Sequence, residues 1–586
     1  MTNMSMSKQP IITLKAQWRD QLNVRDIQEI ALKALALVAT YPMQVAENLD
    51  QAIDKAETNH PQAFCGHGRN LLSVEKDRDG FRQFIDHLIG FQTKGLLTAD
   101  NKFSWVCELL PEIGGREDNP GSALHDRVYQ LIDALLVESN SKTLYIPFES
   151  RLRHTIMLGR SREVFVEGEF SESVPQLLDL ILGGVHYHQS DAPLNPSFVQ
   201  DGKLQKFDAG FIADPWSCRA PSSTLKHNDR FKIHSNNYDH YLIQHAMQQV
   251  EGLLVVAASV SVIASSVASE VEMRQWLLNQ KHLKAVIALP NGLVQGMSIN
   301  SVLMVFDMKQ SYDHVEFITL KGSQFIQKQG REISLAETDQ LVQLILTNTQ
   351  SKNKATIAHA DIAKQGYVFD PDRYVISDDT KQALDALACH ATMRLGNLVQ
   401  IIRPIAIAKL KQEGQTTIYE VQSGDLPEYG YIDTASKPVL VNDNAFNACM
   451  PLFLKANDII ITVRGSVGKV GIVSQDMLDR YQGRVIAGQT NMVLQVIDEK
   501  IINAETVLMQ LRSSFGQARL QLLSAGALIA GVSLKDLKEF QIAMMPAKQQ
   551  EQAAKDLLIQ QAIKQEIIQK QTQARQLDNN IWVWQQ

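Results

Sequence analysis

The chain has 586 residues, of which 45% are hydrophobic and 21% are charged. This length predicts two to four domains, and the ordinary globular composition excludes an extensively disordered chain. The net charge of −7 excludes a uniformly basic surface of the kind that binds nucleic acid without specificity.

Residues 1–141 predict a helical N-terminal domain. Apolar side chains recur every three and four residues over residues 27–38 and again over residues 81–89, which places them on one face of a helix. Between these stretches, Cys65 and His67 lie two residues apart. A zinc site needs four protein ligands, or three and a water, so we interpret this pair as structural and expect no metal site.

Short apolar runs separated by helical stretches follow. They occupy residues 143–148, 163–167, 184–187, 209–213, 253–257, 285–289, 302–306 and 315–318. Strands that alternate with helices form a mostly parallel sheet, and the last two runs are close enough to form an antiparallel hairpin. Residues 142–390 therefore predict an α/β domain with a Rossmann-like sheet and a helical connector at its end.

From residue 391 the pattern changes to short strands joined by turns. The turns carry glycine or asparagine at Ser423-Gly-Asp, Val441-Asn-Asp-Asn and Arg464-Gly-Ser-Val-Gly-Lys469. Residues 391–546 thus predict an α+β domain. From Leu558 to Ile567, apolar residues recur at helical spacing among Gln and Lys, which predicts a long amphipathic helix over residues 547–586.

Charge is distributed unevenly along the chain. Residues 391–586 hold 20 Lys and Arg against 18 Asp and Glu, whereas residues 1–390 hold 37 against 46. Because neither part is strongly basic, a contact with DNA would depend on a local patch.

Four passages resemble the modification subunit of type I restriction-modification systems, a family of S-adenosylmethionine-dependent adenine-N6 DNA methyltransferases. They are residues 206–216, 251–257, 284–293 and 298–306. The most specific is Leu289-Pro-Asn-Gly-Leu293 with the strand that follows it, and the resemblance covers roughly residues 100–375. It implies a cofactor site and a pocket for a flipped-out adenine.

In this family a glycine-rich turn after the first strand admits the cofactor, and an acid at the end of the second strand binds its ribose. The corresponding turn, Ile146-Pro-Phe148-Glu-Ser-Arg151, has no glycine, so a side chain at every position obstructs a close approach. The resemblance makes Phe148, Glu167 or Glu169, and Asp191 the candidate cofactor residues. We expect no bound cofactor, or S-adenosylmethionine if the domain is active.

The adenine pocket of the family carries Asn or Asp, two prolines and an aromatic residue. The Asn or Asp side chain and a backbone carbonyl accept hydrogen bonds from the amino group of the base, and the aromatic ring stacks on it. Asp214-Pro215-Trp216 matches this motif but is one residue short, because Trp216 stands where the second proline belongs. Trp216 either serves the pocket or fills its mouth as part of the core. We expect these catalytic residues to be degenerate.

Residues 391–578 resemble one target-recognition half of a type I specificity subunit. The matching passages follow in the order of that family. They are residues 394–402, 454–470, 487–491, 531–537, 542–546 and 549–552.

Within these passages we predict the contacts with DNA. Glycines in the turn that starts at Arg464 permit left-handed backbone, and such a turn would place Arg464, Ser466 and Lys469 against phosphates. Gln489 and Asn491 have amide side chains suited to base edges. The alternative is a tight hairpin with solvated charges, with Asn491 turned inward to cap a loop.

The long helices of specificity subunits pair in a coiled coil that spaces two recognition domains. This chain has one such half. Its C-terminal helix therefore either forms a homodimer that reads a split, palindromic target, or packs on the methyltransferase-like core.

These features together predict a sequence-specific DNA-binding subunit of a restriction-modification-like or phage-defence system. Its partners would be double-stranded DNA and another protein of the system, with an inactive methyltransferase core as scaffold. The alternatives are an active adenine-N6 DNA methyltransferase with its own specificity domain, and an interaction protein without DNA contact. Five scattered cysteines, no apolar leader and no apolar run of about 20 residues predict a cytoplasmic protein without membrane contact.

Overall fold

The structure is a computed structural model. It describes residues 24–65, 75–106, 124–376 and 378–579, with gaps inside the last three ranges that include residues 150–151, 169–172, 214–217, 406–413 and 525–530. The chain divides into two compact units, Met1–Val375 and Ile376–Gln586. The domain boundaries at residues 141, 390 and 546 remain predictions.

Helices form the N-terminal part of the first unit, as the apolar periodicity predicts. They are α2 (Val24–Thr40), α3 (Pro42–Glu47), α4 (Leu49–Asn59), α5 (Pro61–Phe64), α6 (Glu75–Thr93) and α8 (Asp126–Glu138). Residues 30–38 of α2 are buried, because α6 and α10 (Ser173–Leu182) both pack on this helix.

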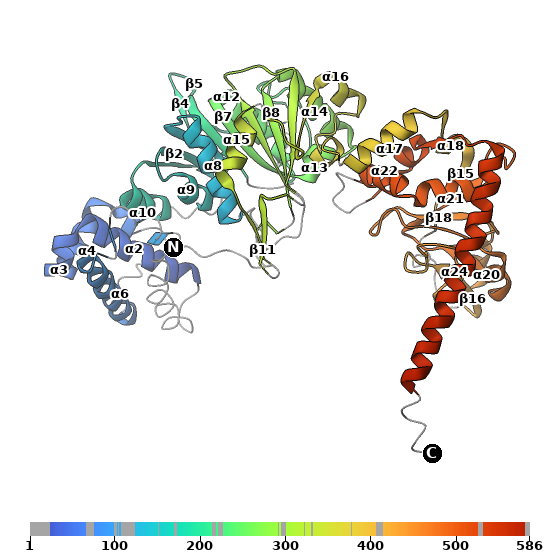
Figure 1. The fold of residues 1–586 in the computed structure, drawn as a ribbon. Coiled ribbons are helices and arrows are strands. Elements are labelled where there is room, and N and C mark those ends of the chain that lie inside the picture. Colours follow the sequence, from blue (N-terminus) through green and yellow to red (C-terminus); the bar gives the residue numbers. More distant parts are fainter. Residues whose placement is uncertain are drawn as a thin grey trace, which may run out of the picture. The chain divides into compact units, whose positions relative to one another are not determined.

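A nine-stranded sheet forms the centre of the first unit (Figure 1). In sheet order its strands are β13 (Lys354–Ala358), β10 (His314–Thr319), β8 (Leu283–Leu289), β9 (Ser301–Asp307), β7 (Val250–Ser259), β6 (Phe207–Ile212), β1 (Thr143–Glu149), β2 (Glu163–Gly168) and β3 (Val185–Gln189). All run parallel except β9 and β13. The sheet confirms the predicted α/β fold class.

The expected hairpin of the last two apolar runs is wrong. Strand β9 does run antiparallel, but it lies between β7 and β8, while β10 pairs with β8. Nearly all of β9 is apolar and buried, so a place inside the sheet with a neighbour on both edges is favoured over a two-stranded ribbon.

Helices cover both faces of the sheet. Along β7, Leu253 and Val255 join the core under α8, α9 (Arg153–Leu158) and α10. Leu254 and Val256 join the core under α12 (Tyr238–Gln249) and α14 (Ala268–Gln280). Because β1, β2 and β6 are parallel neighbours, their carboxyl ends meet at one edge, where such sheets bind ligands.

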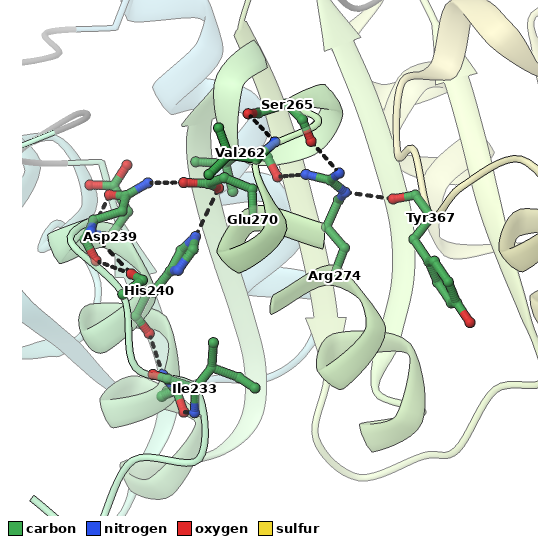
Figure 2. A network of polar contacts seen from close by, with 12 residues as sticks. Ile233, Asp239, His240, Val262, Ser265, Glu270, Arg274 and Tyr367 are labelled. Carbon is green, nitrogen blue, oxygen red and sulfur yellow. Dashed lines mark hydrogen bonds and ion pairs between the residues drawn. The ribbon is translucent and has the colours of Figure 1, made fainter. Parts of the chain in front are cut away.

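A buried polar network ties α12 to α14 on one face of the sheet (Figure 2). His240 Nε2 lies 2.9 Å from Oε2 of Glu270, and Asn237 Nδ2 donates to the other carboxylate oxygen at 3.0 Å. Burial raises the pKa of the Glu270 carboxyl, but these hydrogen bonds and the charge interactions with His240 and Arg274 outweigh it and lower the pKa below its ordinary value.

Arg274 lies one turn further along α14 and holds the connector that follows the sheet. Its three nitrogens donate to three backbone carbonyls, those of Val262, Ser265 and Tyr367 (Figure 2). Burial lowers the pKa of Arg274 to about 10. Because every nitrogen has an acceptor, the buried guanidinium is solvated by the backbone itself.

Two small sheets form the core of the second unit. One has the order β15 (Val399–Ile402), β21 (Asn491–Val496), β18 (Ile459–Thr462), β19 (Val470–Ile472), and the other has the order β17 (Lys437–Val441), β16 (Thr416–Val421), β20 (Val485–Ala487). Strand β14 (Thr392–Arg394) pairs with β22 (Gln541–Ala543), so the start of the domain meets its end. Helices α17 (Asp378–Ala388), α21 (Ala504–Arg512) and α22 (Ser514–Ser524) complete an α+β unit, as predicted.

The last helix, α24 (Ala547–Asn579), is the long C-terminal helix that the sequence predicts (Figure 1). Its first half packs on the second unit through Leu557, which is fully buried, and through Lys564, which pairs with Asp433. Every residue from 565 to 578 is exposed within this unit.

Candidate functional site

The side chain of Glu149 fills the end of strand β1. It is fully buried, and its carboxylate accepts hydrogen bonds from the backbone N–H of His154 and from both the N–H and the hydroxyl of Thr155, the last two at 3.1 and 2.5 Å. These donors belong to the first turn of α9. Where a Rossmann-type sheet presents such N–H groups to an anionic ligand, this chain supplies its own carboxylate.

The described residues on either side of residues 150–151 are also constrained. Leu152 has a φ of 56°, in the left-handed region that side chains adopt only at a cost. On the neighbouring strand, a Cβ added to Gly168 would lie 1.9 Å from the carbonyl oxygen of Glu149. The ends of β1 and β2 are therefore in direct backbone contact.

Glu167, at the end of β2, terminates a series of hydrogen bonds that begins at the half-buried Arg230. Arg230 Nη1 lies 3.3 Å from His245 Nδ1, His245 Nε2 lies 2.8 Å from the hydroxyl of Tyr145, and that hydroxyl donates to Glu167 Oε1 at 2.9 Å. Arginine only donates, so Nδ1 accepts and Nε2 carries the proton of His245. Each of these three hydrogen bonds is then donated in the direction of Glu167.

Burial and the charge of Arg230 lower the pKa of His245 to about 3, so its ring is neutral at physiological pH. Burial, with the charge of Glu167, raises the pKa of Tyr145 well above its ordinary value. The second oxygen of Glu167 accepts from the hydroxyl of Ser190 and, at 3.1 Å, from the N–H of Ser197. Both oxygens of this fully buried carboxylate are thus satisfied from inside the protein.

The structure brings Asp191 and Phe148 together through one tyrosine. The hydroxyl of Tyr238 donates to Asp191 Oδ1 at 2.7 Å, and its ring packs edge-on against Phe148 with centroids 6.3 Å apart. Asp191 also accepts from the N–H of Leu194. Like Glu167, it is engaged in internal contacts.

These residues do not fit S-adenosylmethionine in the manner of the family. The family needs open backbone after β1 and an accessible acid after β2. Here Glu149 occupies the first position, and the Glu167 carboxylate is buried and fully paired. Glu169 lies outside the described residues, as do Asp214, Pro215 and Trp216, which follow the end of β6 at Ile212.

In the second unit, the turn between β18 and β19 has the predicted left-handed glycines. Gly465 and Gly468 have φ values of 77° and 91°. Arg464, Ser466 and Lys469 are all exposed on this turn. The turn therefore leaves two cationic side chains and a hydroxyl accessible to solvent.

The structure separates the two predicted base readers. Gln489 is exposed, and its loop is tied to the strand that leads into the turn by a hydrogen bond from Val463 N to Thr490 O at 2.9 Å. Asn491 is fully buried, which agrees with the alternative in which it turns inward, so its amide is not presented to a base edge in the structure. Its amide instead accepts from the hydroxyl of Thr462 and donates to the carbonyl of Val421, so that both of its polar groups are satisfied inside the domain.

The two family models that match the chain follow each other along it. The model of the N-6 DNA methylase family matches residues 168–383, and that of the type I restriction modification DNA specificity domain matches residues 391–574. The chain joins an N-6 DNA methylase domain to a type I specificity domain. Both resemblances seen in the sequence are thereby confirmed, and no curated protein matches the chain.

Solved structures that the chain resembles include the methyltransferase subunit of a type I restriction-modification system from Streptococcus thermophilus. It is 14% identical over 63% of this chain and 99% of its own, with a TM-score of 0.48. The type IIG restriction endonuclease BpuSI is 9% identical over 94% and 74%, with a TM-score of 0.48. The type IIL restriction-modification enzyme MmeI, solved with DNA, is 10% identical over 91% and 87%, with a TM-score of 0.46.

Several residues of the first unit and of the specificity domain were not predicted. Tyr145, Arg230 and His245 come from distant parts of the chain and carry no motif. Glu149 could have been noticed, since it is an acid in a turn that is expected to hold glycine. Gln517, whose amide donates to Gly468 O at 2.8 Å and supports the turn in the specificity domain, lies 49 residues after Gly468 and gave no signal in the sequence.

Among the described residues, His, Cys, Asp and Glu form no group of three or more placed to hold a metal ion, and His67 lies outside these residues. No described helix is long and apolar enough to cross a membrane.

Proposed function

We propose that the chain is a sequence-specific DNA-binding subunit of a restriction-modification-like or phage-defence system, in which the methylase domain is a scaffold that does not transfer methyl groups. The observation that carries the second part is the carboxylate of Glu149 bound at the start of α9. The carboxylate of S-adenosylmethionine would have to displace a buried side chain that already has its hydrogen bonds, and both oxygens of the buried Glu167 already accept hydrogen bonds.

The specificity domain supports the first part. An exposed arginine and an exposed lysine flank a glycine turn, and an exposed amide lies on the adjoining loop. Cations of this kind position a protein on phosphates, and amides read base edges. A separate protein of the system would then supply the chemistry.

The cysteines are scattered along the chain and odd in number, which supports a cytoplasmic location.

We also propose a homodimer through α24. Ile559, Ile563 and Ile567 are spaced four residues apart along the helix, and between 37% and 56% of each is exposed. A second copy would cover this stripe and place two recognition domains on a palindromic target.

The competing function is an active adenine-N6 DNA methyltransferase, which the family match and the retained Asp214-Pro215 favour. Calorimetric titration of the full chain with S-adenosylmethionine, with and without duplex DNA, separates the two. We expect no saturable heat and no transfer of a labelled methyl group. Saturable binding together with methyl transfer that Asp214→Ala abolishes would overturn the scaffold proposal.

A further inference from the structure

The buried amide of Asn491 joins three strand ends that come from both sheets of the specificity domain. Its Nδ2 donates to the carbonyl of Val421, the last residue of β16, at 2.9 Å. Its Oδ1 accepts from the hydroxyl of Thr462, the last residue of β18, at 2.9 Å. Asn491 itself is the first residue of β21.

Each of these strand ends adjoins a loop or turn with at least one exposed residue. Val421 precedes the turn of residues 422–424, Thr462 precedes the turn of residues 464–469, and Asn491 follows the loop of residues 488–490. We call these three segments the recognition edge. It contains every exposed residue for which we propose a contact with DNA.

Backbone hydrogen bonds also connect the segments of the recognition edge, in addition to those of the Asn491 amide. Gly488 N donates to the same carbonyl of Val421 at 2.9 Å, and Asn491 N donates back to Gly488 O at 2.9 Å. Backbone hydrogen bonds therefore connect Gly488 and Asn491, the two ends of the loop that carries Gln489, and attach this loop to Val421. The Asn491 side chain offers a donor to Val421 and an acceptor to Thr462 at the same time.

We infer that Asn491 is a positioning residue for sequence readout, which fixes Gln489 relative to the phosphate-facing turn. This inference rests on the proposed DNA-binding function. Base readout needs a side chain placed to a fraction of an ångström, whereas long cationic side chains still reach phosphates after a small shift. Loss of the amide should therefore weaken specific binding and spare non-specific binding.

The test uses the full chain and two duplexes of equal length, one enriched by the wild-type protein from a randomised pool and one of random sequence. Asn491→Asp keeps the acceptor for Thr462 and removes the donor to Val421. We expect about tenfold weaker binding of the enriched duplex and less than about twofold change for the random one, the size expected when one base-reading side chain is lost. Thr462→Val removes only the other hydrogen bond and serves as the milder variant if Asn491→Asp lowers the melting temperature.

A matched control is available in the same unit. Asn503 Nδ2 donates to the carbonyl of Gln550 at 3.0 Å, away from the recognition edge, so Asn503→Asp makes the same chemical change elsewhere. We expect it to alter neither affinity.

A double-mutant cycle separates positioning from a general loss of stability. Gln489→Ala should weaken binding of the enriched duplex about tenfold in the wild type but less than about twofold in the Asn491→Asp background. Equal effects of Gln489→Ala in both backgrounds, or equal weakening of both duplexes by Asn491→Asp, would overturn the inference. If the wild-type protein enriches no sequence at all, the proposed function fails first.

Discussion

Glu149 shows how one residue can change what the end of a strand can bind. Backbone N–H groups at the first turn of a helix attract a negative charge. The Glu149 carboxylate would be costly to bury alone, but the N–H groups of His154 and Thr155 and the Thr155 hydroxyl satisfy it. The sequence shows that the turn after the first strand lacks glycine. Only the structure shows that the Glu149 carboxylate binds at the first turn of α9.

His245 makes the first unit sensitive to acid. Its pKa is about 3 in the folded chain, where burial and Arg230 oppose its protonation, and about 6.5 when unfolded. Between these values the unfolded chain binds a proton that the folded chain does not. The free energy of unfolding therefore falls as the pH falls below about 6.5, by up to about 1.4 kcal/mol per pH unit from this residue.

Urea unfolding of the wild type and of His245→Gln at pH 7, 6 and 5 tests this prediction. The variant is expected to be less stable at pH 7, because it loses the hydrogen bonds of the ring, but to lose less stability on acidification. Other titrating groups are common to both proteins, so parallel pH profiles would contradict the assignment.

At the scale of elements, helix α24 is half anchored and half exposed. Its anchored half is fixed by Leu557 and Lys564, and its second half presents apolar residues to solvent within the unit. A helix that is polar enough to stay soluble but keeps an isoleucine stripe is typical of one that pairs with another helix. The amphipathic spacing was evident from the sequence. Which part of the helix packs against the rest of the second unit was not.

We predict that Ile563→Glu combined with Ile567→Glu converts a dimer into a monomer, because four charges would be buried at the paired helices. Sedimentation velocity at micromolar concentrations measures the change. Gln565→Glu combined with Gln569→Glu adds the same charge to exposed positions off the stripe and should leave the dimer intact. A wild-type chain that sediments as a monomer throughout this range would remove the dimer proposal.

At the scale of the whole molecule, charge limits how the chain can hold DNA. With a net charge of −7, and 20 basic against 18 acidic residues from residue 391 onwards, few phosphates can be neutralised. Each neutralised phosphate contributes about 0.9 to the slope of log affinity against log salt concentration. A shallow salt dependence is therefore expected.

Arg464→Ala combined with Lys469→Ala should lower the magnitude of this slope by about 2 and weaken binding to enriched and random duplexes alike. Filter binding or fluorescence anisotropy between about 50 and 200 mM salt measures the slope. Ser466→Ala keeps both charges and is the matched control. An unchanged slope in the double variant would show that the turn does not contact phosphates.

The sequence by itself determined the two domains and their order, because strand periodicity, glycine turns and family motifs are local signals. It also located the exposed turn from Arg464 to Lys469, whose glycines fix the backbone over a few residues. Only the tertiary structure decided that β9 lies inside the sheet, that a chain from Arg230 to Glu167 closes the end of β2, and that Asn491 faces inward. Each of these depends on burial and on partners far apart in the chain, and a residue's pattern of neighbours in sequence carries no information about such partners.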